Sequence, residues 1–450
     1  MHAQIFAVVI FLLMFAAIIL NKVPRHLPAL AGGALTILIV FLLVMQSPAT
    51  VITVLNFRQL FQAAFWLPGH HPLESSGVNW QTIIFIAGMM IMVEGLGKCG
   101  FFRWLCLWVA RVVNYKAVSI LVAFTLLSGF LSMFMDSITV LLFFATVTIE
   151  LSRLMKFDPV PVIISEIFAA NIGGSATMAG DPPNIIIGTA LGYSFSDFVV
   201  NTGLIAWIGL FVALGFFFLV FRKKLQTPRD RGDAAPIACP AASSAISNRR
   251  VFATFIAIFL LVVALLITHA QTGISVALIG VIAAVLTLFF GRQDASHILK
   301  KVDWQTLLFF FGLFICVSGL EQTGALKTLA SSISRISGGR FIVVVTIILW
   351  LSAFASAVVD NIPFAATMIP VIKGLAASGM PLPALAWTLA LGTDIGGSGT
   401  PIGASANVVG LSIAEKEGYK VSWGRYCKVA VPAMILVVGV CWLLLILRYG

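Results

Sequence analysis

Charged residues are scarce in this chain. Only 10% of the 450 residues are Asp, Glu, Lys or Arg, whereas 60% are hydrophobic. Because so few charges cannot cover the surface of a water-soluble domain, a soluble core fold is excluded. Apolar runs of about 20 residues, long enough to cross a bilayer, predict a polytopic membrane protein. These runs lie at about 5–21, 27–45, 80–97, 198–221, 251–268, 273–291, 304–320 and 429–447.

The signatures of several other protein classes are also missing. The six cysteines form no C-x-x-C pair, so they predict neither a disulfide framework nor a zinc site. No G-x-x-x-x-G-K-[ST] stretch is present, so the chain is not expected to hydrolyse ATP. We therefore expect no enzyme, no cofactor and no bound metal. The first residues lack a basic region and a small-residue cleavage site, which favours a first membrane span over a signal peptide.

The net charge of +11 reflects where the basic residues lie. Placing the loop 222–233 in the cytoplasm and counting spans outward puts 22 of the 28 Lys and Arg on that side, Lys22 and Arg25 among them. Membrane topology therefore accounts for the charge, and no nucleic-acid partner is expected. We predict an inner-membrane protein with the linker 222–250 in the cytoplasm and both termini on the periplasmic side.

An internal repeat divides the chain. Residues 78–102 align without gaps to residues 302–326, with 11 of 25 positions identical at an offset of 224. The same offset pairs Asp136 with Asp360. Two homologous halves, 1–221 and 251–450, joined by the polar linker 222–250, are therefore expected.

The span count predicts that the two halves are inverted. The segments at about 116–155 and 341–376 each have a polar kink at the middle, and basic residues flank the first on both sides. Read as re-entrant hairpins, they leave five spans in each half, an odd number that turns the second half upside down. The expected fold is all-α, with two inverted repeats, about ten transmembrane helices and two re-entrant hairpins.

Two segments are too rich in glycine and proline to be continuous helices. NIGGSATMAGDPPN at 171–184 has a partial copy, DIGGSGTPIGASAN, at 394–407. Glycine permits unusual dihedrals and proline blocks the helix, so the spans at about 159–191 and 384–413 should break at mid-membrane. Broken ends expose a partially positive N-terminus and free carbonyls, which together can hold a small polar solute or a cation. Glycines that only permit tight helix packing would not account for GDPP or for its recurrence.

Ionisable groups at the predicted kinks are the candidates for proton coupling. A carboxylate at mid-membrane costs about 2.5–3.5 kcal/mol even on a gentle scale, so Asp136, Asp360 and Asp394 need a function there. The alternative for each is an N-terminal helix cap. Asp181 is interpreted as a cap or turn residue, and Glu94 and Glu166 as either pathway or interfacial residues.

These motifs resemble those of the ion transporter superfamily. The pair NIGGSATxxGDPPN and GxDIGGxxTPIG, together with the Asp-tipped hairpins FMDSIT and VVDNIP, is similar to that of the arsenite/antimonite efflux permeases and the related P permeases. GDPPN and GASANVV are typical of the P permeases, whereas GTDIGG and SWGRY resemble the arsenite permeases. The resemblance covers about 80–220 and 300–430.

The resemblance implies a site where the hairpin tips meet the broken helices. It also implies a dimer with a scaffold and an elevator-like transport region, and it allows a cytoplasmic ATPase partner docked on the basic loops. The candidate substrate and ion-binding residues are Asp136, Ser137, Thr139, Asn171, Gly173, Gly174, Ser175, Thr177, Gly180, Asp181, Asn184, Asp360, Asn361, Asp394, Gly396, Gly397, Ser398, Thr400, Gly403 and Asn407.

The chemistry of the tips ranks the substrates. Two Asp-bearing tips repel a dicarboxylate, so a carboxylate transporter is the weakest alternative. Neutral arsenous acid can donate its hydroxyl protons to carboxylates and carbonyls, which favours proton-coupled efflux of arsenite or antimonite. A sodium/proton antiporter is the alternative. A channel is disfavoured because inverted hairpins are the architecture of alternating access.

Overall fold

The computed structural model describes residues 2–20, 22–67, 77–225 and 240–450, and within them the chain is helical without a strand. The all-α polytopic fold is therefore confirmed. Nine described helices are long and apolar enough to cross a membrane. Residues 226–239 of the expected linker lie outside the described part.

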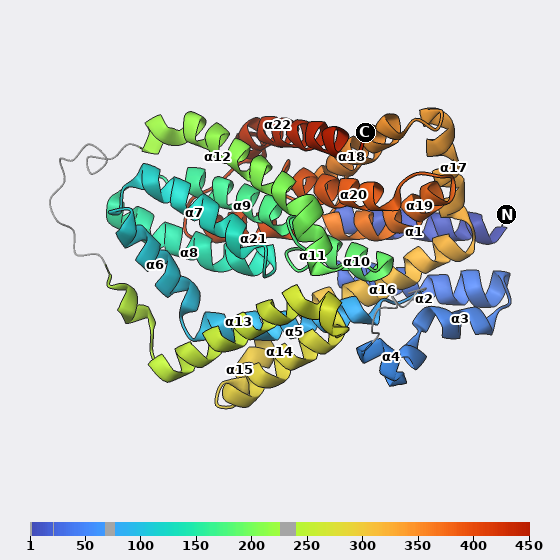
Figure 1. Ribbon diagram of the computed structural model, residues 1–450, viewed down its shortest axis with the longest axis horizontal. Helices are drawn as coiled ribbons and strands as arrows, with labels where there is room; N and C mark the ends of the chain where they lie inside the picture. The colour runs from blue at the N-terminus through green and yellow to red at the C-terminus, as the bar shows by residue number, and fades with distance from the viewer. Residues whose placement is uncertain (1, 21, 68–76, 226–239) are drawn as a thin grey trace.

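The elements follow in chain order in Figure 1. The first half contains α1 (His2–Leu20), α2 (His26–Leu35) with a π-helical continuation (Thr36–Val44), α3 (Pro48–Leu55), α4 (Ala63–Trp66), α5 (Trp80–Lys98), α6 (Phe101–Val112), α7 (Ala117–Leu131), α8 (Ser137–Met155), α9 (Val160–Gly174), α10 (Pro182–Leu191), α11 (Phe195–Phe198) and α12 (Leu204–Leu225). The second half contains α13 (Arg249–Thr272), α14 (Val276–Phe290), α15 (Ala295–Lys301), α16 (Trp304–Gln322), α17 (Ala325–Ser337), α18 (Phe341–Val358), α19 (Asn361–Ala377), α20 (Leu382–Gly397), α21 (Ser405–Lys416) and α22 (Trp423–Tyr449).

The helices pack as two groups. In the α5–α16 group, α5 packs on α14, α2 on α16, and α1 on both α2 and α16. In the α9–α20 group, α7 packs on α9, α18 on α20, and α12 and α22 cover them. Figure 1 shows α5, α13 and α14 along one edge, with α9, α12 and α20 above them. Between the groups α10 meets α5, and α19 meets α16.

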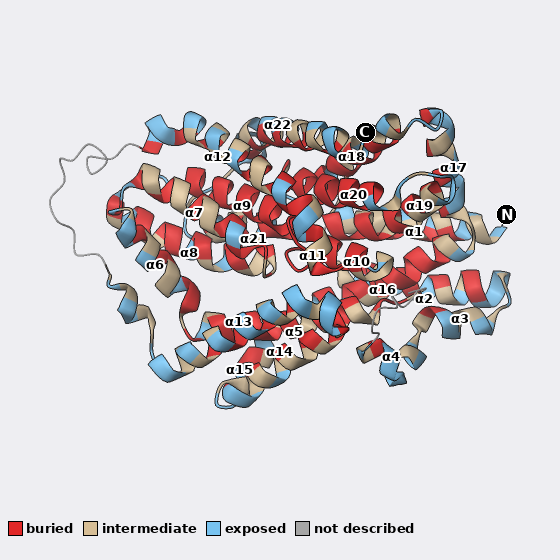
Figure 2. Ribbon diagram, in the orientation of Figure 1, coloured by how far each residue is buried: buried red, intermediate tan, exposed pale blue. Residues whose placement is uncertain are grey.

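The broken helices lie at the centre of the second group. Every residue of α9 is buried, and so is nearly every residue of α20. A helix that is buried all round belongs to a core, whereas α1 turns Leu12 and Leu13 outward, as a lipid-facing helix does. Figure 2 shows the same contrast between the buried centre and the exposed outer helices.

Helix interruptions are present in both glycine-rich segments. Helix α9 ends at Gly174 and α10 begins at Pro182, while α20 ends at Gly397 and α21 begins at Ser405. Pro182 and Pro183 occupy the first positions of α10, where the missing N–H is not needed. The inverted orientation of the two halves stays a prediction.

A glycine lets each broken helix pack directly against the backbone of a neighbouring helix pair. These pairs are α7–α8 in the first half and α18–α19 in the second. A Cβ on Gly173 would lie 2.0 Å from the carbonyl oxygen of Gly129 in α7, and one on Gly396 would lie 2.4 Å from that of Ala353 in α18. Because backbone atoms cannot yield as a flexible side chain does, no larger residue fits at either position.

We expect Gly173→Ala and Gly396→Ala each to lower the melting temperature in detergent. Overpacking of this kind costs about 1–3 kcal/mol. Gly439→Ala in α22 is the matched control, because a Cβ there meets nothing within 4 Å. Equal melting temperatures for Gly173→Ala and Gly439→Ala would show that the close approach of α9 to α7 is wrong.

Candidate functional site

Two asparagine side chains close the breaks. Asn184 Nδ2 donates to the carbonyl oxygens of Gly174 (2.8 Å) and Thr177 (3.0 Å). In the other half Asn407 Nδ2 donates to the carbonyl oxygens of Gly397 and Thr400, both at 2.7 Å. Each amide therefore spends both protons on its own break, and its oxygen is left for a partner elsewhere.

Threonine hydroxyls fasten the breaks to the tips of the helix pairs. Thr177 donates to the carbonyl oxygen of Met133, and Thr400 donates to that of Ala357. The pairs α7–α8 and α18–α19 are thereby held beside the breaks. The structure thus brings together the tips and the broken helices of each half.

Asn171 joins the two halves. Its Nδ2 donates to Ser398 Oγ at 3.0 Å and to Asn407 Oδ1 at 2.9 Å. All three side chains are buried. The two breaks therefore form one polar centre.

Asp181 contacts both helix-pair tips. Its Oδ1 accepts a hydrogen bond from Ser137 Oγ (2.6 Å), and its Oδ2 accepts one from Asn361 Nδ2 (3.1 Å). Although Asp181 stands at the N-cap position of α10, its side chain makes no capping hydrogen bond. Of the two interpretations of Asp181, the side-chain cap is wrong because the tips of both halves bind its carboxylate, whereas its place in the turn before α10 agrees with the structure.

The other tip carboxylates do act as caps. Asp136 Oδ2 accepts from the N–H and the hydroxyl of Thr139, both at 3.3 Å. Asp360 Oδ1 accepts from the N–H of Ile362 at 3.2 Å. The alternative of a helix cap therefore holds for both residues, in addition to any role in transport.

Acceptor oxygens without partners gather in the buried centre. Asp394 lies inside α20, in its last turn, and is fully buried with neither carboxyl oxygen paired in the described part of the chain. The side-chain oxygens Asn171 Oδ1, Asn184 Oδ1 and Asp136 Oδ1 are likewise unpaired there. Buried polar atoms normally have partners, and these five acceptors outnumber the two unpaired hydroxyls nearby, on Ser132 and Ser352, so the centre is short of donors.

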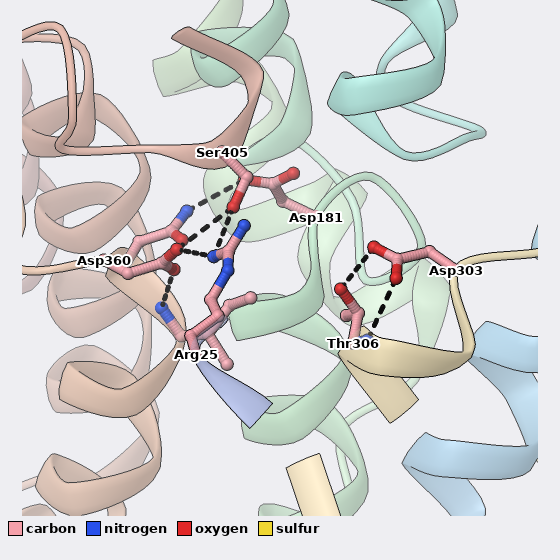
Figure 3. A network of polar contacts seen from close by, with 8 residues as sticks. Arg25, Asp181, Asp303, Thr306, Asp360 and Ser405 are labelled. Carbon is pink, nitrogen blue, oxygen red and sulfur yellow. Dashed lines mark hydrogen bonds and ion pairs between the residues drawn. The ribbon is translucent and has the colours of Figure 1, made fainter. Parts of the chain in front are cut away.

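Arg25 is a site residue that the sequence reading missed. It precedes α2, and its guanidinium forms an ion pair with Asp360 Oδ2 and donates to Ser405 Oγ at 2.8 Å. Ser405 also donates to Asp360 Oδ2 at 3.0 Å, which completes the triangle in Figure 3. Topology alone had accounted for Arg25, so no sequence signal singled it out. The pair joins the α5–α16 group to the α9–α20 group.

Asp303 is a second residue that was missed. It caps α16 by accepting from the N–H (3.1 Å) and the hydroxyl (2.5 Å) of Thr306. The aligned repeat carried a signal, because Asp303 stands opposite Asn79 in VNWQT and VDWQT. A comparison of acids between the repeats would have found it.

The remaining predicted residues have structural partners. Ser175 donates to the carbonyl oxygen of Ile172 at 2.7 Å. Gly180 and Gly403 approach the backbones of Gly174 and Gly397 so closely that neither position admits a side chain. Glu166 is fully buried and accepts from Thr148 Oγ1 at 2.5 Å.

Comparisons with known proteins agree with a membrane transporter. A family model described as citrate transporter (CitMHS) matches residues 15–392. A 46 kDa membrane protein of Mycobacterium leprae is 31% identical over 99% of both chains. An uncharacterized transporter of Mycobacterium tuberculosis also shares 31% identity over 99% of both chains. The human P protein is 29% identical over 85% of this chain and 56% of its own length.

Two solved structures share the fold. The YdaH transporter of Alcanivorax borkumensis superimposes with a TM-score of 0.58 at 15% identity, covering 99% of this chain and 98% of that one. MtrF of Neisseria gonorrhoeae, described among antimetabolite efflux pumps, gives 0.53 at 13% identity and covers 94% and 93%. At these identities the likeness concerns the fold alone.

Proposed function

The chain belongs to the CitMHS citrate transporter family of the ion transporter superfamily, and from this premise we propose that it is a proton-coupled secondary active transporter that exports arsenite or antimonite. The substrate is the neutral trihydroxide. The site is the polar centre between the two breaks and the helix-pair tips, and Asp136, Asp360 and Asp394 are the candidates for proton coupling.

The surplus of buried acceptors carries this proposal. Five unpaired side-chain oxygens, on Asp136, Asn171, Asn184 and Asp394, need donors. Protons and the three hydroxyls of arsenous acid supply donors, whereas a carboxylate substrate would add more acceptors. A site with such a deficit of donors favours a cationic or hydroxyl-donating occupant.

Sodium/proton exchange is the second candidate. Carboxylate and amide oxygens are hard ligands of the kind that alkali and alkaline-earth cations prefer, and the same unpaired atoms supply them. Export of a carboxylate ranks third. Arg25 supports it, because a guanidinium binds carboxylates, but this guanidinium is already paired with Asp360.

Alternating access is proposed to occur between the two helix groups. The site lies in the α9–α20 group, and the Arg25–Asp360 pair is a contact that crosses to the α5–α16 group. Inverted repeats with broken helices support rigid movement of one group against the other. An inner-membrane location, a homodimer and a docked cytoplasmic ATPase belong to the same proposal.

Everted vesicles test the substrate directly. We expect arsenite to accumulate when a proton gradient, acidic inside, is imposed, and we expect Asp394→Asn to abolish the gradient-driven part of the uptake. Asp136→Asn and Asp360→Asn are measured in parallel. Retained gradient-driven uptake in all three variants contradicts proton coupling at these residues. Sodium uptake without arsenite uptake supports the second candidate, and citrate uptake supports the third.

A further inference from the structure

The two breaks share 7 of 14 aligned positions, and they differ in the placement of their acids. At an offset of 223, Asn184 aligns with Asn407, and Asn171 aligns with Asp394. Asn184 and Asn407 make equivalent pairs of hydrogen bonds to the carbonyl oxygens of their own breaks. The contacts of Asn171 therefore indicate which contacts the side chain of Asp394 is expected to make at the equivalent position.

Asn171 shows what this position does. Its Nδ2 donates to Asn407 Oδ1, the atom of the Asn407 amide that makes no hydrogen bond within its own break. This bond ties α9 of one half to α21 of the other. The equivalent bond on the other side would run from Asp394 in α20 to Asn184 Oδ1 in α10.

That second bond requires a proton. Because α10 packs on α20 and the repeat pairs Asp394 with Asn171, the Asp394 carboxyl is placed opposite the Asn184 side chain, both of whose N–H groups are already donated to Gly174 and Thr177. Asn184 can therefore offer only Oδ1, which has no partner in the described residues. A carboxylate beside an amide oxygen is a contact between two acceptors, whereas a protonated carboxyl has the shape and donor of asparagine.

We propose that Asp394 carries a proton that it donates to Asn184 Oδ1, so that the two halves are joined by one permanent hydrogen bond and one proton-dependent hydrogen bond. This inference deepens the proposed function by assigning the coupling proton to one bond. Release of the proton places the Asp394 carboxylate against Asn184 Oδ1, two acceptors, and so breaks the hydrogen bond between α20 and α10. The Asn171–Asn407 hydrogen bond is unaffected. The movement that follows deprotonation is therefore one-sided.

The surrounding charges agree with this assignment. Asp181 is a second acid buried beside the breaks, so a carboxylate on Asp394 would add negative charge to a centre that already holds an acid. Asp181 itself is turned toward Ser137 and Asn361. The ion pairs formed by described residues include no partner for Asp394.

Infrared difference spectroscopy of the purified protein in lipid tests the proton without any transport. At neutral pH we expect a carbonyl-stretch band of a protonated carboxyl that is absent in Asp394→Asn and retained in Asp136→Asn. Glu166→Gln removes any band of a second fully buried acid, one of whose oxygens is unpaired, and serves as the control. A spectrum unchanged by Asp394→Asn overturns the inference, and so does a band that sodium chloride abolishes but choline chloride does not.

Moving the acid to the other half is the second test. In Asn171→Asp/Asp394→Asn the permanent and the proton-dependent bonds exchange places, so we expect the carboxyl band to return. We expect the melting temperature of the wild type to fall as pH rises and the proton leaves, and that of Asp394→Asn to stay constant. Equal pH dependence in the two proteins overturns the inference. A carboxyl band without gradient-driven transport counts against the proposed function and leaves this inference standing.

Discussion

Reversing one charge at the boundary between the helix groups, Arg25→Glu, is expected to reduce transport by about 30-fold. Asp360 is only 10% exposed and accepts two of its hydrogen bonds from Arg25 and Ser405. Removing one partner of a buried pair costs several kcal/mol, and because Arg25 is 36% exposed we take about 2 kcal/mol, which converts to the expected factor. The measurement is initial uptake in proteoliposomes at equal protein density.

Exchanging the two charges shows whether transport depends on the attraction between residues 25 and 360 or on the particular side chains at each position. Arg25→Glu/Asp360→Arg restores the opposite charges, so we expect transport to recover in part, limited by loss of the bond from Asp360 to the N–H of Ile362. Arg103→Glu is the matched control, because Arg103 pairs with Glu150 at a more exposed position and such pairs are worth little. Equal losses for Arg25→Glu and Arg103→Glu, or no recovery in the swap, would rule out the boundary role.

Local chemistry explains why the helix breaks were predictable. Proline and glycine act on the backbone of their own segment, so GDPPN and its copy predicted interruptions that the structure has at 175–181 and 398–404. The Asp-tipped pairs were predictable for the same reason, because an aspartate before a helix is a local cap. Repetition of both motifs strengthened the prediction.

The partners of the acids were not predictable, because they come from distant segments. Arg25 and Asp360 are 335 residues apart, and no sequence motif contains both of them. GDPP is typical of a helix start, so Asp181 was interpreted as a cap or turn residue, yet its partners Ser137 and Asn361 lie on the two tips. Periodicity and propensity describe a segment, whereas these bonds depend on how the segments pack.

The family match changes how the acidic site is weighed. Two acids at the tips argued against a carboxylate substrate, but Arg25 neutralises one of them. Among the described residues, the remaining acids form no ion pair with a basic side chain. These acids are Asp136, Asp181 and Asp394. On the proposed function, a bound proton or cation would bring the centre toward neutrality, whichever substrate is carried.

Asp181→Ala is expected to lower transport by at least 100-fold. Asp181 holds Ser137 of one tip and Asn361 of the other, and each buried donor left without its acceptor costs about 1–3 kcal/mol. Truncation removes both bonds and leaves two buried donors unpaired, which amounts to about 3 kcal/mol or more and at least a hundredfold in rate.

A graded series shows whether Asp181 acts as a hub between the tips or only fills space. Asp181→Asn can still accept from Asn361 and donate to Ser137, so we expect it to keep the melting temperature of the wild type, whereas Asp181→Ala lowers it. Asp158→Ala is the control, because that carboxylate pairs with Arg425 at the surface. Since both tips depend on one carboxylate, Ser137→Ala and Asn361→Ala should lose less than their sum when combined. Strict additivity of the two losses would mean that the tips are held independently, and Asp181 would then not couple the two halves.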